Sequence, residues 1–287
     1  MPGLLQIGAN SHSQSMAFDH DPVPWLIARG WAATLVEPQP DAVAKLQSRY
    51  QGNTGVRVVQ AAVCADATTE SMPLYFINGS RTLGSNESDA RCLGDAVAGT
   101  ASFSKQHVLS HQRFYRFTPS QCAACAARLG RALPPTCMKR AYADNLDVLQ
   151  VPCAPAAQVL KPLGDGGGSS RVALIVIDAE GEDDHVAMRL LEMRLGQPPA
   201  VLVYEHSHLR PSRHAALKTK LRDAGMRPYN RSGAALRLGE DAPAMPAASW
   251  AQLRRALVRV EARDNSVWLF GGREPLAADS PPPTPSA

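Results

Sequence analysis

Carboxylates and imidazoles follow three of the apolar runs in this sequence, and these side chains could accept a proton or hold a ligand. Glu37 follows the run AATLV, Asp178 and Glu180 follow VALIVI, and His206 follows VLVYE. A carboxylate can accept hydrogen bonds from a ribose diol, and a carboxylate or imidazole can take the proton of a reacting hydroxyl. Because the carboxyl ends of parallel strands meet at one edge of a sheet, we expect these side chains to lie together.

The first of these strand ends belongs to a recognisable unit. The run LLQI stops at Gly8 and Asn10, as a buried strand does at a tight turn, and a glycine there lets the backbone approach a ligand. A short helix at 22–29 and a strand at 32–36 follow, so the unit is the first half of a nucleotide-binding α/β fold. The alternative is that each strand-end carboxylate only caps the next helix. A whole set of such strand ends favours a binding site.

Apolar periodicity predicts the elements that position these residues. Further helices are expected at 40–52, 185–195, 212–224 and 249–260. Further strands are expected at 56–63, 71–77, 147–151, 172–178, 200–204, 226–230 and 267–270. The alternation of strands and helices predicts an α/β fold, a mostly parallel sheet with helices on both faces, closed by its last strand as an antiparallel edge.

The domain organisation follows from where periodicity fades. We predict one domain over residues 1–275, with a cysteine-containing insertion at about 78–146 that is rich in Ser, Gly and Arg. Residues 276–287 are expected to be a disordered, proline-rich tail. If the domain is an enzyme, the residues that select its substrate should lie in the insertion and in the loop after His208.

Composition excludes several classes of protein. The 287 residues are 45% hydrophobic and 20% charged, which is enough to bury a sizeable core. A net charge of +4 without a basic run interleaved with aromatics gives no reason to expect nucleic acid as a partner. No apolar run is long enough for a transmembrane segment and no signal peptide opens the chain, so the default location is cytoplasmic. The first strand begins near residue 4, as it would in a trimmed chain.

Five motifs, QIGAN, DPVPWLIARGWAATLVEPQP, VVQAAVC, VIDAEG and YEHSHL, occur in this order over roughly residues 4–77 and 147–235. In order and spacing they resemble the FkbM-type methyltransferases, which use S-adenosylmethionine. The resemblance implies the class I methyltransferase fold, a Rossmann-like, mostly parallel seven-stranded sheet with its last strand antiparallel. It also implies methyl transfer to a hydroxyl of a sugar or other small-molecule acceptor.

The resemblance implies a role for each motif residue. The residues implied to contact the cofactor are Gln6, Gly8, Asn10, Glu37, Ala61 and Ala62. The first three would border the methionine part, Glu37 would bind the ribose hydroxyls, and the two alanines would lie near the adenine. Ser11 and His12 stand where an Asp-Gly pair is typical of the family, and they are expected to crowd the methionine pocket.

The catalytic residues implied by the resemblance are Asp178 and Glu180, which would face the transferred methyl group and the acceptor. The sulfonium already activates the methyl group, so the enzyme mainly has to align the acceptor oxygen and remove its proton. Asp178 is our first choice for the base and His206 the second.

The insertion holds a second group of candidate ligands, Cys122-x-x-Cys125 and Cys137, preceded by His107-x-x-x-His111. Tetrahedral zinc suits such ligands, so a structural zinc on Cys122, Cys125, Cys137 and His111 is one hypothesis. Disulfides and free thiols are the alternatives.

Two further sets of residues allow competing interpretations. Cys64 and Cys153 lie in strand patterns and are expected to be small core residues. Glu205, His206 and His208 could bind a catalytic divalent ion together with Asp178, or simply form local hydrogen bonds.

Two other functions compete with methyl transfer. One is a dinucleotide-dependent oxidoreductase, against which the incomplete G-x-G-x-x-G pattern counts. The other is an inactive methyltransferase-like binding or scaffold module. The oligomeric state is not predicted.

Overall fold

A computed structural model of the chain describes residues 2–10, 21–64, 68–77, 101–110, 122–123, 126–127, 130, 132, 146–159, 172–192, 201–228, 247–257 and 265–270. Ser11 and His12, the zinc candidates other than Cys122, and the tail at 276–287 lie outside this part of the chain.

The core of the fold is a mixed seven-stranded sheet with the strand order β10-β11-β9-β8-β1-β2-β3. Its strands are β1 (Gly3–Ile7), β2 (Ala32–Glu37), β3 (Val56–Gln60), β8 (Val172–Ile177), β9 (Val201–Glu205), β10 (Met226–Pro228) and β11 (Asn265–Phe270). Neighbours from β3 to β9 pair in parallel, whereas β11 is antiparallel to both β9 and β10. The α/β class is confirmed, and the sheet combines parallel and antiparallel pairs. The prediction that the last strand lies at the edge is wrong, because β10 occupies that edge and β11 is inserted beside it.

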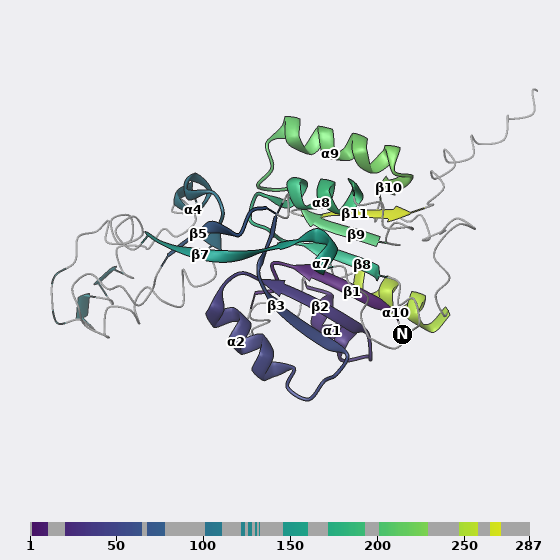
Figure 1. Cartoon of the computed structure of the whole chain (residues 1–287), viewed down its shortest axis with the longest axis horizontal. Coiled ribbons are helices and arrows are strands. Elements are labelled where there is room, and N and C mark those ends of the chain that lie inside the picture. The colour runs from purple at the N-terminus through teal and green to yellow at the C-terminus, as the bar shows by residue number, and fades with distance from the viewer. Residues whose placement is uncertain are drawn as a thin grey trace, which may run out of the picture.

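Helices cover both faces of this sheet (Figure 1). The helices on one face are α1 (Val23–Ile27), α2 (Pro40–Arg49) and α10 (Ala247–Leu257), and those on the other are α7 (Ala156–Val159), α8 (Asp183–Glu192) and α9 (Pro211–Asp223). The alternation of side chains along a strand supplies both layers, as Leu4 packs in the first core and Leu5 in the second. Burial on both faces explains why the central strands read as continuous apolar runs.

A smaller four-stranded sheet lies beside the main one, in the order β4-β7-β5-β6. Its strands are β4 (Ala62–Cys64), β5 (Ser71–Ile77), β6 (Ala101–Ser102) and β7 (Leu146–Pro155), with helix α4 (Lys105–Ser110) packed against β5 and β6. The single strand predicted at 56–63 is therefore wrong. Because β3 is an edge strand of the main sheet, the chain is free to leave that sheet at Ala61 and to pair as β4 with β7.

A disulfide between Cys64 and Cys153 joins β4 to β7, with their Cα atoms 5.5 Å apart. The expectation of small core residues holds for Cys64, which is buried, but the disulfide was not predicted, because strand pairing brings together residues that are 89 positions apart in the sequence. Cys122 is also in a disulfide, and no free thiol occurs among the cysteines in the described ranges.

None of the helices in the described residues is long and apolar enough to cross a membrane.

Candidate functional site

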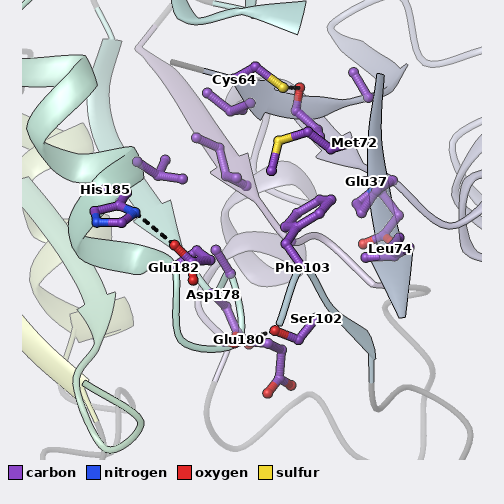
Figure 2. Close-up of a pocket in the computed structure, with 18 of the residues that line it drawn as sticks. Glu37, Cys64, Met72, Leu74, Ser102, Phe103, Asp178, Glu180, Glu182 and His185 are labelled. Atoms are coloured by element: carbon purple, nitrogen blue, oxygen red, sulfur yellow. Dashed lines mark hydrogen bonds and ion pairs between the residues drawn. The ribbon is translucent and has the colours of Figure 1, made fainter. Parts of the chain in front are cut away.

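A cavity of about 440 Å³ opens at the carboxyl ends of β1, β2 and β8. Residues of the smaller sheet and of α8 complete its walls (Figure 2). Five of the predicted cofactor residues line it, as do Asp178 and Glu180; the five are Gly8, Asn10, Glu37, Ala61 and Ala62. Its volume lies within the range of small-molecule pockets, about 300–1,000 Å³.

Gly8 brings the ends of two strands into contact at the floor of this cavity. Its φ is +77°, and a Cβ built there would lie 1.7 Å from the carbonyl oxygen of Asp178. Its N–H donates to the carbonyl of Val36 at 2.9 Å, so the turn also touches β2. Gly8 therefore allows the backbones of β1 and β8 to approach so closely that any side chain at this position would collide with Asp178.

Glu37 presents a carboxylate at the end of β2, although its residue is only 3% exposed. Its Oε2 accepts the N–H of Asn10 at 2.8 Å, and its Oε1 accepts the N–H of Gln39 at 2.9 Å. Burial raises the pKa of Glu37 from 4.5 to about 7, and these two hydrogen bonds oppose part of the rise. Asn10 adopts a left-handed φ of +49°, which aims its N–H at the carboxylate.

Gln6 is the predicted cofactor residue that does not line the cavity. It is buried, and its Nε2 donates to Oδ2 of Asp21 at 2.9 Å. The other carboxylate oxygen of Asp21 accepts the N–H of Val23, the first residue of α1, at 2.9 Å. Gln6 thus supports the start of α1.

One wall of the cavity is apolar and comes largely from outside the predicted motifs. Met72, Leu74 and Phe103 line the cavity (Figure 2), as do Ala61 and Ala62. Phe103 belongs to the segment predicted as an insertion without readable pattern. An aromatic ring facing a cavity offers a surface for a planar ligand group.

Asp178 lines the cavity, and its residue is exposed there. Partial desolvation by the surrounding protein raises its pKa well above its usual value, and the neighbouring charges of Glu180, Glu205 and Asp183 raise it further. Its side chain is hydrogen-bonded to Glu205, whose pKa is lowered by hydrogen bonds that include those from His208 and Asp178. We assign the shared proton to Asp178, because Glu205 has the additional partner His208 at 3.1 Å.

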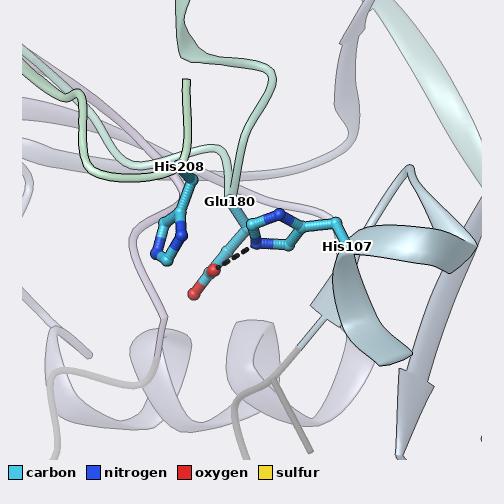
Figure 3. A group of neighbouring side chains, drawn as sticks. All are labelled: His107, Glu180 and His208. Atoms are coloured by element: carbon cyan, nitrogen blue, oxygen red, sulfur yellow. Dashed lines mark hydrogen bonds and ion pairs between the residues drawn. The ribbon is translucent and has the colours of Figure 1, made fainter. Parts of the chain in front are cut away.

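Glu180 lies between two histidines that come from distant parts of the chain (Figure 3). The Oε2 atom of Glu180 lies 3.3 Å from Nε2 of His107 on α4. The ring of His208 meets the ring of His107 edge to face, with 4.7 Å between centroids. Ligand atoms of all three residues lie within 4.8 Å of one another.

The predicted metal-binding group at the end of β9 is only partly assembled. Glu205 contacts His208 and Asp178, as that prediction requires. His206 instead stacks on His214 at 4.9 Å between ring centroids and is absent from the cavity lining. This placement gives no support to His206 as the base.

Cys122, one of the proposed zinc ligands in the insertion, is not available to bind zinc. Cys122 is in a disulfide, so its sulfur is not the thiolate that zinc requires. His107, which precedes those cysteines in the sequence, faces Glu180.

Among the charged groups of the cavity lining in the described part of the chain, carboxyl groups outnumber basic ones. Five carboxyl groups line it, on Glu37, Asp178, Glu180, Glu182 and Glu192. The basic side chains of the lining are Arg189 and His185. Arg189 pairs with Glu192 at 2.9 Å, and His185 pairs with Glu182 at 2.8 Å. The site therefore favours a cationic ligand over an anionic one.

No protein-family model, no curated protein and no solved structure matches this chain.

Proposed function

We propose that this protein is an S-adenosylmethionine-dependent methyltransferase that acts on a hydroxyl of a small molecule. The observation that carries the proposal is Glu37, a buried carboxylate at the end of β2 that faces a ligand-sized cavity. A carboxylate has about four lone-pair positions. The N–H groups of Asn10 and Gln39 take one on each oxygen, which leaves one on each for the two hydroxyls of a ribose.

The strand order supports the same proposal. Connections leave β1 toward β2 on one side and β8 lies on its other side, so the strand order reverses at this point, where open α/β sheets bind ligands. The antiparallel strand β11 also supports the proposal, because the class I methyltransferase sheet that the FkbM resemblance implies has its last strand antiparallel.

The charge of the cavity supports a sulfonium cofactor. S-adenosylmethionine carries a positive sulfur and an ammonium group, and its demethylated product lacks the sulfonium charge. An acidic lining binds the cationic donor more tightly than the product, which favours release after transfer.

The chemistry required of the protein is modest. The acceptor oxygen attacks the methyl carbon, the carbon–sulfur bond breaks with its electron pair going to sulfur, and the hydroxyl proton must leave. We assign the role of base to Asp178, which lines the cavity and would take that proton while it passes its own along its hydrogen bond to Glu205.

A dinucleotide-dependent oxidoreductase fits this site less well. Such enzymes bind a pyrophosphate at the N-terminus of the helix after β1. Here Asp21 already occupies the N–H of Val23 at that end, and its carboxylate would repel a phosphate. The acidic lining adds to this repulsion.

Calorimetric titration of the purified protein tests the proposal. We expect S-adenosylmethionine to bind and NAD not to bind. Glu37→Ala should weaken binding on the order of 100-fold, because two hydrogen bonds to a charged group are lost. Glu70→Ala removes an exposed carboxylate away from the cavity and serves as the charge-matched control. A thermal melt of each variant shows whether it is folded. If neither S-adenosylmethionine nor its demethylated product binds the wild type, the proposal fails; cofactor binding without methylation in an acceptor screen would indicate an inactive binding module.

The same titration at pH 6 and pH 8 adds a second readout. Glu37 ionises as pH rises through about 7, and the ionised form binds the diol and the cation better, so affinity should rise by up to about tenfold. The unliganded protein should respond in the opposite sense. The folded form holds the Glu37 proton more tightly than the unfolded chain does. The protonated Glu37 therefore adds to the free energy of unfolding below pH 4.5, and this contribution is lost as pH rises through 7.

A further inference from the structure

We propose that His107, Glu180 and His208 bind a divalent transition-metal ion at the wall of the cavity. Two imidazoles and one carboxylate are a donor set that such ions use in catalytic sites, with positions left open for substrate. None of the five sequence motifs contains all three residues, and His107 lies outside every one of them.

The spacing of the three side chains fits a coordination sphere. With metal–ligand bonds of about 2.1 Å, neighbouring ligand atoms lie roughly 3.0–3.4 Å apart. His107 Nε2 and Glu180 Oε2 are already 3.3 Å apart, and the whole set lies within 4.8 Å. Side-chain rotation on the order of 1 Å would complete the sphere.

The backbone holds Glu180 and His107 in place. Glu180 adopts a φ of +50°, a conformation that is costly for a residue with a side chain and that collects at functional sites. Ser102 fixes it by donating its hydroxyl to the Glu180 carbonyl at 2.9 Å. At the next position, a Cβ on Gly181 would lie 3.1 Å from Nδ1 of His107, so the absence of a side chain makes room for the ring.

The surroundings resemble the outer shell of a metal site. His208 Nε2 lies 3.1 Å from Oε1 of Glu205, and a carboxylate bonded to one ring nitrogen orients a histidine and raises its basicity as a ligand. The carboxyl groups of Asp178, Glu205 and Asp183 also lie beside the cluster, and acidic surroundings of this kind favour a cation.

The inference rests on the proposed function for its chemical role. Glu180 belongs both to the cluster and to the cavity lining, so an ion held here would lie beside the acceptor. A bound divalent ion lowers the pKa of a coordinated hydroxyl. It would therefore orient the acceptor oxygen and ease its deprotonation near Asp178. Nitrogen donors favour Zn²⁺, Mn²⁺ or Fe²⁺ over Mg²⁺ and Ca²⁺.

The test is metal binding by the full chain without any cofactor. Protein stripped with a chelator is titrated with Zn²⁺ by calorimetry and with Mn²⁺ by electron paramagnetic resonance. We expect one tight site per chain, weakened at least about 100-fold in Glu180→Gln and in His208→Ala. His214→Gln removes a histidine that pairs with Tyr204 outside the cavity, and it should bind as the wild type does.

Two outcomes would overturn the inference: no tight ion in the wild type, or the same tight ion in both ligand variants. Because an unfolded variant would also lose the ion, thermal melts without metal accompany each titration. The ion should raise the melting temperature of the wild type but not of Glu180→Gln. S-adenosylmethionine binding measured in excess chelator separates the two proposals, since it tests the cofactor site while the metal site is empty.

Discussion

At the floor of the cavity, the space between Gly8 and the backbone of Asp178 excludes even one methyl group. Gly30 offers a matched comparison, since its φ of +83° is similar but nothing lies within 4 Å of a Cβ built there. A substitution at Gly30 thus measures only the cost of placing a side chain on a left-handed backbone, whereas one at Gly8 adds the cost of a steric collision.

Gly30→Ala should lower the free energy of unfolding by about 1 kcal/mol, the cost of a side chain in the left-handed region. Gly8→Ala must in addition displace the carboxyl end of β8, so it should lower the free energy of unfolding by more than about 4 kcal/mol. Urea denaturation of both variants measures the difference. Similar losses at the two positions would mean that β1 and β8 do not approach as closely as described.

Residue identity alone predicted part of the site. Gly8, Glu37, Asp178 and Glu180 could be chosen because strand ends of a parallel sheet converge. His107 and Phe103 could not be chosen in the same way, since they follow no strand of that sheet and lie in a segment without periodicity. The only signal for His107 was its proximity to cysteines, which suggested a different partner.

At the scale of elements, an ion pair between a buried carboxylate and a half-buried arginine joins α8 to α9. Arg213 Nε donates to Asp184 Oδ2 at 2.7 Å, and its Nη2 also contacts Oδ1 of Asp184 and Glu182. Asp184 is 1% exposed, so this pair differs from the exposed Arg189–Glu192 pair within α8.

Arg213→Ala should lower the free energy of unfolding by about 3 kcal/mol, because it leaves the Asp184 carboxylate buried without its cation. Arg189→Ala removes the same kind of side chain from the exposed pair and should cost no more than about 0.5 kcal/mol. Chemical denaturation at pH 7 compares them. Equal small effects would show that α9 moves to let water reach Asp184.

Element boundaries were predictable for segments that belong to a single sheet. They were not predictable for the segment that contributes strands to two sheets. The strand at 71–77 and the helix at 40–49 begin and end close to their expected residues. The run at 56–63 has one continuous apolar pattern but serves two sheets, β3 in one and β4 in the other. Nothing in that local pattern specifies the change of partner, because β7 comes from residues 146–155.

On the scale of the whole molecule, the disulfide between Cys64 and Cys153 closes a long loop and links two strands of the small sheet beside the cavity, which Cys64 lines. Structural disulfides form and persist in oxidising compartments. We therefore expect the protein to mature in such a compartment, in contrast to the default cytoplasmic prediction.

Cys64→Ala/Cys153→Ala should lower the free energy of unfolding by about 4 kcal/mol, given the length of the loop. Peptide mapping by mass spectrometry without reductant should find the two cysteines linked. Expression in an oxidising host compartment should give more folded wild-type protein than expression in a reducing one. Free thiols at both positions in folded, stable protein would contradict the disulfide and the expected compartment together.

The sequence by itself determined the layered α/β architecture and one edge of the site. Hydrophobic periodicity is a local property, and strand-end chemistry follows once the strands are parallel. Only the tertiary structure decided that Gln6 supports α1, that Cys64 bonds Cys153, and that His107 and His208 flank Glu180. Each of these contacts joins segments far apart in the chain, and local pattern carries no information about which distant segment will meet which.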